Sequence, residues 1–147
     1  MRSVVQRVKW AEVKIDGKVA GKINEGLLVL LGVCDDDTLD DTKWLCDKIS
    51  GLRIFTDSED KMNLSLDDIG GEILIVSQFT LYGRCKKGRR PDFTSAGKPD
   101  YAEKMYEEFV SYMKTKVKKV ETGRFGEHME VSLLHDGPVT LIIDTKE

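Results

Sequence analysis

The feature that most constrains the fold is an uninterrupted apolar run, LLVLLGV, at Leu27–Val33. The run has the length of one strand, and no polar residue alternates along it, so it predicts a central strand covered on both faces. A second apolar run, ILIVSQF at Ile73–Phe79, predicts another buried strand. A chain built around such strands must place other elements over both faces of its sheet.

Shorter β-rich segments surround these two strands. Asp16-Gly17 is typical of a tight hairpin turn, and Asp136-Gly137-Pro138 also predicts a turn between two strands. Thr56–Lys61 is polar and predicts an exposed turn. The further strands expected are Val4–Trp10, Ala11–Ile15, Lys18–Ile23, Arg53–Phe55, Met129–His135 and Val139–Asp144.

Two helices are expected. Asp35–Thr38 supplies N-cap candidates for the first, and Gly51 lies near its end. Pro99 and Asp100 open the second, after a polar loop at Thr80–Lys98. The apolar stripe of the first helix is expected at Trp44, Leu45, Lys48, Ile49 and Leu52. That of the second helix is expected at Tyr101, Met105, Phe109 and Met113. We therefore predict one α+β domain over residues 1–147, with two main helices on a largely antiparallel, twisted sheet or half-barrel.

The composition excludes several classes of protein. Apolar residues make up 40% and charged residues 33% of the 147-residue chain, as in an ordinary globular domain. No apolar run approaches the ~20 residues of a membrane span, and the N-terminus lacks a signal-peptide pattern, so we expect a cytoplasmic protein. The three cysteines form no CxxC pair, and the two histidines have no partner at ligand spacing. We therefore expect neither a metal nor another cofactor.

Positive charge is concentrated in one short segment. Five of the seven residues at Arg84–Arg90 are basic, whereas the whole chain has a net charge of −3, so the remainder stands at −8. A cationic loop on an anionic body draws phosphate-bearing ligands to one place. The basic residues are Arg84, Lys86, Lys87, Arg89 and Arg90.

Two segments are candidates for chemistry. Ser77, Gln78 and Thr80 lie where a buried strand leaves the core, although hydroxyl groups there often only bond to nearby backbone. Gly137-Pro138 allows close approach to the backbone, although its simplest interpretation is a hairpin turn. The chain has no GxSxG motif, and neither histidine can be placed beside a hydroxyl from the sequence, so a catalytic triad is not evident.

Seven motifs occur in order along nearly the whole chain: QRV at Gln6–Val8, GLLVLLGV at Gly26–Val33, RIF at Arg53–Phe55, KMNLS at Lys61–Ser65, VSQFTLY at Val76–Tyr82, GRF at Gly123–Phe125 and MEVSLLHDGPVT at Met129–Thr140. Taken together, these motifs resemble those of the D-aminoacyl-tRNA deacylases. That family hydrolyses the ester between a D-amino acid, or achiral glycine, and the 3′-terminal ribose of tRNA, and it spares L-aminoacyl esters. The resemblance implies a homodimer in which the Gly-Pro element of one chain completes the active site of the other.

The resemblance also implies roles for individual residues. Gly137-Pro138 is expected to be a cis peptide whose carbonyl oxygens face the substrate α-carbon, so that an L side chain clashes while a D side chain or hydrogen does not. Arg7 is expected to brace this element. Ser77, Gln78, Phe79 and Thr80 are expected to line the pocket for the ester and terminal adenosine, with Phe125 and Met129 nearby.

Two mechanisms are compatible with these residues. Thr80 is a possible nucleophile, but no base is evident. We favour activation of water with help from the ribose 2′-hydroxyl of the substrate, and stabilisation of the oxyanion by backbone N–H groups near Phe79 and Thr80.

One residue departs from the family pattern, and two other functions compete. His135 stands where the family usually has Asn, which predicts a mild dependence of activity on pH between about 5.5 and 7.5. A non-catalytic tRNA- or DNA-binding module would use Arg84–Arg90 but would not explain why the two motifs occur together. A small-ester hydrolase would use Thr80 or Ser77 and is disfavoured by the missing base.

Overall fold

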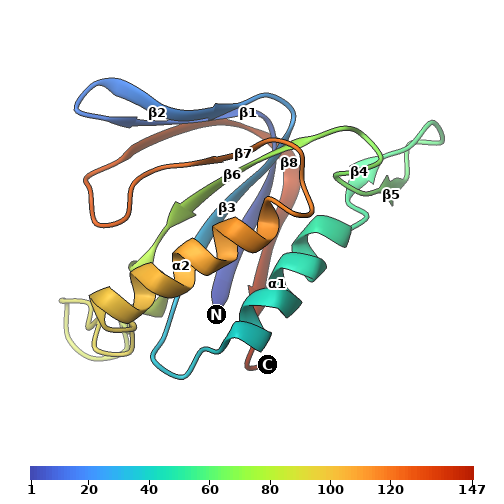
Figure 1. The fold of residues 1–147 in the computed structure, drawn as a ribbon. Coiled ribbons are helices and arrows are strands. Elements are labelled where there is room, and N and C mark those ends of the chain that lie inside the picture. The colour runs from blue at the N-terminus through green and yellow to red at the C-terminus, as the bar shows by residue number, and fades with distance from the viewer.

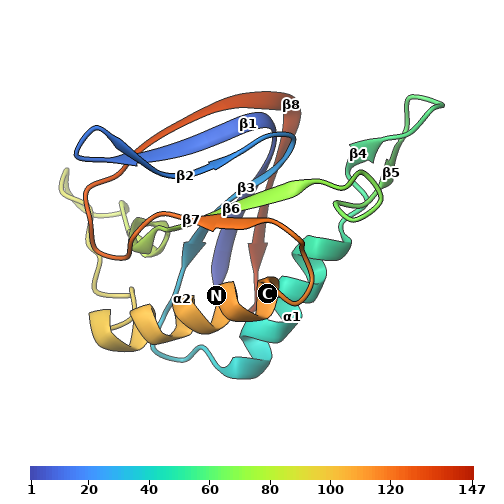
Figure 2. The same cartoon turned by 45° about the horizontal axis from the view of Figure 1, so that its top comes forward.

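The computed structural model describes residues 1–147, and its two helices lie side by side along one face of a curled sheet (Figures 1 and 2). Both chain termini lie near these helices. No helix is long and apolar enough to cross a membrane. The elements are β1 (Arg2–Ile15), β2 (Lys18–Ile23), β3 (Gly26–Gly32), α1 (Leu39–Gly51), β4 (Phe55–Thr56), β5 (Met62–Leu64), β6 (Glu72–Ser77), the 3₁₀ turn η1 (Phe79–Tyr82), α2 (Pro99–Met113), β7 (Val120–Thr122) and β8 (Glu130–Asp144).

The main sheet is mixed, with strand order β2-β1-β3-β6-β7 and with β8 also paired to β1. Pairings of β1 with β2, β3 and β8 are antiparallel, whereas those of β3 with β6 and β6 with β7 are parallel. A Cβ atom at Gly21 in β2 would lie 2.6 Å from the carbonyl oxygen of Thr122 in β7. The outer strands therefore approach each other, and the sheet curls into a nearly closed barrel.

The two faces of β3 confirm the prediction of a central strand covered on both sides. Leu27 belongs to the larger core, of 22 buried residues, which also contains the buried apolar residues of both helices. Leu28 belongs to a second core, of 7 buried residues, enclosed within the curled sheet. Successive side chains of a strand point to opposite faces, so consecutive apolar residues serve the two cores alternately.

Helix α1 begins where it was expected, but part of its predicted buried stripe is wrong. Thr38 caps the helix: its Oγ1 accepts from the N–H of Asp41 at 3.3 Å, and the Asp41 carboxylate accepts from the N–H of Thr38 at 2.8 Å. Trp44 is 46% exposed, with the Lys48 ammonium 5.5 Å from its ring centroid. The face toward the core instead uses Thr42 and Cys46 beside the correctly predicted Leu45 and Ile49.

The predicted turn at Asp136-Gly137-Pro138 is wrong, because β8 is one strand of 15 residues. Gln6 pairs with Thr140 and Val8 with His135, so Asp136–Val139 forms a bulge opposite Arg7. The long β1, itself expected as two strands, offers a continuous ladder to both halves of β8. The extra residues leave that ladder as a bulge without reversing the chain.

Three smaller differences concern the bounds of two strands and the presence of a third. Strand β6 stops at Ser77, because Phe79–Tyr82 winds into a 3₁₀ turn. The strand predicted at Arg53–Phe55 is found at Phe55–Thr56, paired with β5. Strand β7, of only three residues, was not predicted, because so short a segment carries no clear periodic pattern.

Candidate active site

The SQFT segment lies where β3 and β6 end together. Leu31 of β3 pairs with Ser77 of β6, and the N–H of Gln78 donates to the Leu31 carbonyl oxygen at 2.7 Å. The chain then turns away from the sheet. A small pocket of about 70 Å³ opens at this point, lined by Leu31, Val33, Ser77, Gln78, Phe79, Ala102, Tyr106, Phe125 and Gly126. Four of the predicted site residues, Ser77, Gln78, Phe79 and Phe125, are thus brought together.

Tyr106 of α2 was missing from the predicted site. Its hydroxyl donates to the Ile75 carbonyl oxygen at 2.9 Å, and its ring centroid lies 6.0 Å from that of Phe125. Burial raises the pKa of Tyr106, so the hydroxyl stays protonated and serves as a donor. The only signal in the sequence was an aromatic residue next to Met105 on the buried face of a helix.

Thr80 lies on the turn beside the pocket and has a local partner. The side-chain amide of Gln78 donates to Thr80 Oγ1. In a 3₁₀ turn the first N–H groups have no acceptor within the turn, which leaves those of Phe79 and Thr80 available to an oxyanion. Phe79 lines the pocket, and Thr80 follows it on the same turn.

No histidine contacts the hydroxyls of this site. His135 Nε2 lies 3.1 Å from the Val139 carbonyl oxygen and 3.0 Å from Thr140 Oγ1, within the bulge of β8. His128 is exposed on the loop before β8. The pocket therefore contains hydroxyl groups and backbone donors but no paired imidazole base.

The Gly137-Pro138 peptide is cis, as the resemblance implied, and both residues are exposed. Arg7 holds the bulge from beneath. Its Nε donates to the Asp136 carbonyl oxygen at 3.2 Å and lies 3.0 Å from Asp136 Oδ2, while Nη1 donates to the Ile54 carbonyl oxygen at 2.6 Å. The bulge is not part of the pocket lining within one chain.

Met129 is not brought into the pocket lining. Its side chain packs against the second core, inside the curled sheet. A Cβ atom at Gly123 would lie 2.4 Å from the Met129 sulfur, so a larger residue there would require the Met129 side chain to shift.

The five basic residues of the Arg84–Arg90 loop are all exposed, and none of them forms an ion pair within the protein. Backbone hydrogen bonds between Arg84 and Asp92, at 2.8 and 2.9 Å, close the loop at its base. The loop therefore presents five cations to solvent, none of them held in an ion pair.

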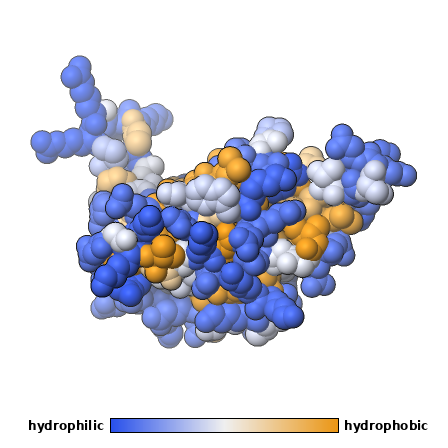
Figure 3. Space-filling model, turned by 90° about the horizontal axis from the view of Figure 1, so that it is seen from above, coloured by the Kyte–Doolittle hydropathy of each residue, from blue (hydrophilic) through white to orange (hydrophobic).

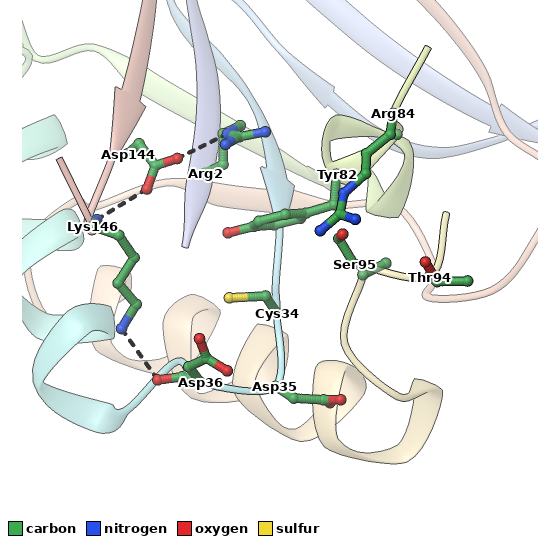
Figure 4. Close-up of a pocket in the computed structure, with 12 residues that line it drawn as sticks. Arg2, Cys34, Asp35, Asp36, Tyr82, Arg84, Thr94, Ser95, Asp144 and Lys146 are labelled. Carbon is green, nitrogen blue, oxygen red and sulfur yellow. Dashed lines mark hydrogen bonds and ion pairs between the residues drawn. The ribbon is translucent and has the colours of Figure 1, made fainter. Parts of the chain in front are cut away.

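A larger and more polar pocket of about 610 Å³ adjoins the turn on the side of Tyr82 (Figure 4). Arg2 and Asp144 pair at 2.9 Å on its wall, and Lys146 pairs with Asp41 at 2.9 Å. Arg84 extends over the pocket toward Ser95 and has no carboxylate partner. No group of three or more His, Cys, Asp or Glu side chains is placed to hold a metal ion.

Comparisons with known proteins agree with this geometry. The family model for D-Tyr-tRNA(Tyr) deacylase matches residues 4–144. Curated proteins called D-aminoacyl-tRNA deacylase are 61% identical in Thermosipho africanus (100% of this chain, 99% of the relative) and 60% identical in Desulfatibacillum aliphaticivorans (99% and 100%).

Solved structures share the fold. One, described as "c-Myc DNA Unwinding Element Binding Protein", superposes with a TM-score of 0.92 at 37% identity over 98% of both chains. Another, described as "Structural Analysis of a probable eukaryotic D-amino acid tRNA deacylase", does so with a TM-score of 0.81 at 20% identity over 97% of both. The family match over nearly the whole sequence, together with full-length relatives at about three-fifths identity, places this chain in the D-Tyr-tRNA(Tyr) deacylase family.

Proposed function

We propose that the protein hydrolyses the ester joining a D-amino acid to the 3′-terminal ribose of tRNA and leaves L-aminoacyl esters intact. The observation that carries the proposal is the pocket at Ser77–Phe79, which adjoins a turn whose first N–H groups have no acceptor within it and which leads directly into the basic loop Arg84–Arg90. The 61% identical relative is named for the same activity. An ester carbonyl in the pocket, with tRNA phosphates at the basic loop, would use both features.

The pocket takes only part of such a substrate. Small-molecule sites usually enclose ~300–1,000 Å³, whereas this pocket measures about 70 Å³. We place the ester at the N–H groups of Phe79 and Thr80, and the adenine against the exposed ring of Phe79. Much of the aminoacyl group then remains uncovered by this chain alone.

The chiral filter comes from a second copy of the chain in this proposal. Gly137 and Pro138 do not line the pocket of their own chain, yet they are exposed on a bulge that Arg7 holds rigidly. Supplied by a partner, their carbonyl oxygens would face the α-carbon of the substrate and clash with an L side chain. Selectivity then depends on exclusion of the L form, not on affinity for the D form.

Exposed apolar residues beside the bulge support a homodimer. Trp10 of β1 pairs in register with Leu134 of β8, and these residues are 37% and 50% exposed. Ile142, on the other side of the bulge, is 74% exposed. Viewed from the side where β1, β2 and β8 lie uppermost, the surface is mostly hydrophilic with separate hydrophobic patches (Figure 3). Burial of these residues against a second copy would bring Gly137-Pro138 to the partner's pocket.

For the chemical step we favour water activated with help from the substrate ribose 2′-hydroxyl. Thr80 lacks a base, because both histidines lie elsewhere and its hydroxyl accepts from Gln78. The N–H groups of Phe79 and Thr80 would stabilise the negative charge that develops on the carbonyl oxygen. Glycyl-tRNA, including glycine mischarged on tRNA(Ala), would also be hydrolysed, because glycine has no side chain for the filter to exclude.

The test is a comparison of three substrates. D-Tyr-tRNA, L-Tyr-tRNA and a small activated ester are incubated with the protein, and release of the acyl group is followed. Turnover of the D-ester alone supports the proposal. Turnover of the small ester without preference for tRNA would instead indicate a general esterase.

A second candidate function is nucleic-acid binding without catalysis. It is favoured by the unpaired cations of the loop and by the printed description of the 37% identical structure as a DNA-unwinding-element binding protein. Gel-shift titration with tRNA and single-stranded DNA, combined with the deacylation assay, separates the two functions. Tight binding with no acyl release would support the second.

A further inference from the structure

An exposed aromatic pair lies between the candidate active site and the basic loop. Phe79 of η1 and Phe93 of the loop meet edge to face, with ring centroids 5.4 Å apart and planes at 70°. Phe79 is 56% exposed and Phe93 is 38% exposed. Phe79 already belongs to the proposed site, whereas no role has been assigned to Phe93. Contact between water and these rings is unfavourable, so covering them makes the free energy of binding of a ligand more favourable.

The position of Phe93 is fixed by the loop. The Asp92 carboxylate accepts from the N–H of Thr94 at 2.8 Å, and the Phe93 carbonyl oxygen accepts from the N–H of Ala96 at 3.0 Å. The ring lies directly over Gly83, where a Cβ atom would be 2.9 Å from it. The exposed ring is therefore held in place before any ligand arrives, which reduces the entropy cost of binding.

Charge beside the ring matches a nucleotide strand. Arg84 follows the glycine beneath Phe93, and Figure 4 shows its side chain at the rim of the larger pocket. Inside that pocket the other two cations are already paired, Arg2 with Asp144 and Lys146 with Asp41. The carboxylates of Asp35 and Asp36 lie on the same wall, so the unpaired cation available to a phosphate is Arg84. A phosphate near Phe93 is thus favoured at the rim, beside Arg84.

We propose that Phe93 is a stacking surface for the base of the unpaired nucleotide that precedes the terminal adenosine of tRNA, with a phosphate of that nucleotide beside Arg84. This inference rests on the proposed function, which places the terminal adenosine at Phe79. Since the two rings touch, a base on Phe93 is the neighbour of that adenosine along the strand. An aromatic face combined with nearby cations is the usual means of holding single-stranded RNA without reading its sequence.

The test uses substrates of increasing length. D-tyrosyl-adenosine carries one nucleoside and no phosphate, D-tyrosyl-cytidylyl-adenosine carries two nucleosides joined by one phosphate, and D-Tyr-tRNA carries the whole strand. Phe93→Leu keeps apolar volume over Gly83 but removes the aromatic face. It is expected to raise KM for the two longer substrates roughly five- to hundredfold, with kcat unchanged and with no effect on D-tyrosyl-adenosine.

Two further variants sharpen the result. Phe93→Tyr keeps the aromatic face and is expected to behave as wild type. The matched control is Trp44→Leu, which replaces another exposed aromatic residue on α1 and is expected to change no KM. Arg84→Met is expected to lower the slope of log affinity for tRNA against log salt by about one.

Binding of a short oligonucleotide that ends in CCA separates this inference from the proposed function. Tighter binding by wild type than by Phe93→Leu supports the stacking surface, even if no ester is hydrolysed. Absence of ester hydrolysis would overturn only the proposed function. Equal binding and equal KM values would overturn the stacking surface. So would an equal KM increase on all three substrates, or a change of oligomeric state in sedimentation without a change in RNA affinity.

Discussion

Replacement of Arg7 by Met tests whether this side chain is the support of the Asp136–Val139 bulge. The guanidinium is only 9% exposed and makes hydrogen bonds to the carbonyl oxygens of Ile54 and Asp136, as well as an ion pair with the Asp136 carboxylate. Each hydrogen bond to a charged group contributes about 1.5–3 kcal/mol, and removal of one partner leaves the other unsatisfied. Asp136 is 27% exposed and keeps Lys9 at 3.6 Å, which offsets part of the loss.

We therefore expect Arg7→Met to lower the free energy of unfolding by about 2–4 kcal/mol, which corresponds to a fall in Tm of about 5–15 °C for a domain of this size. Urea unfolding measures the first quantity and calorimetry the second. The matched control is Lys9→Met, because Lys9 faces the same carboxylate but is 55% exposed, and such pairs contribute at most about 1 kcal/mol.

A double-mutant cycle with Asp136→Asn isolates the contribution of the pair itself, and a coupling of about 0.5–3 kcal/mol is expected for residues in direct contact. If the Arg7→Met protein folds, the proposed filter predicts faster hydrolysis of L-Tyr-tRNA relative to D-Tyr-tRNA, because a loosened bulge would exclude the L side chain less well. A loss of stability no larger than that of Lys9→Met, with unchanged selectivity, would refute the role of Arg7 as a support.

Three other predictions concern single residues. Thr80→Ala is expected to keep much of the deacylation rate measured with D-Tyr-tRNA, because no base activates its hydroxyl; complete loss with the fold intact would support a nucleophile. Burial alone would raise the pKa of Asp41, but hydrogen bonds from Lys146 and Thr38 outweigh burial and lower this pKa to about 2. The ionised carboxylate therefore stabilises the folded state at pH values above its pKa in the unfolded chain, and this stabilisation is lost as the pH falls toward 2. Asp41→Asn should therefore unfold with a smaller change in Tm between about pH 5 and 2 than wild type does, and equal slopes would contradict this assignment. His135→Asn is expected to preserve D-selectivity in the deacylation assay, because an amide can still donate to the Val139 carbonyl oxygen; faster hydrolysis of L-Tyr-tRNA would show that the imidazole itself is needed to hold the bulge.

The sequence predicted best what depends on local periodicity. The apolar run at Leu27–Val33 indicated a strand covered on both faces, and the structure places Leu27 and Leu28 in different cores. The cap at Thr38 followed from side-chain chemistry that acts over three residues. Pairing between distant strands does not depend on such patterns, so the continuity of β8 along β1 was missed.

The wrong prediction at Asp136-Gly137-Pro138 has a consequence for function. A hairpin turn would reverse the chain and place these residues at an end of the sheet. In a bulge they project from the middle of a long strand, between the exposed residues Leu134 and Ile142 and above the guanidinium of Arg7. A bulge in that place can be presented to a second molecule by an extended sheet face, whereas a turn at a sheet end would need a separate contact. In the proposed dimer, the pairing of β8 along β1 would let this bulge reach the pocket of the other chain, so the β1–β8 face is the surface on which that dimer should be tested first.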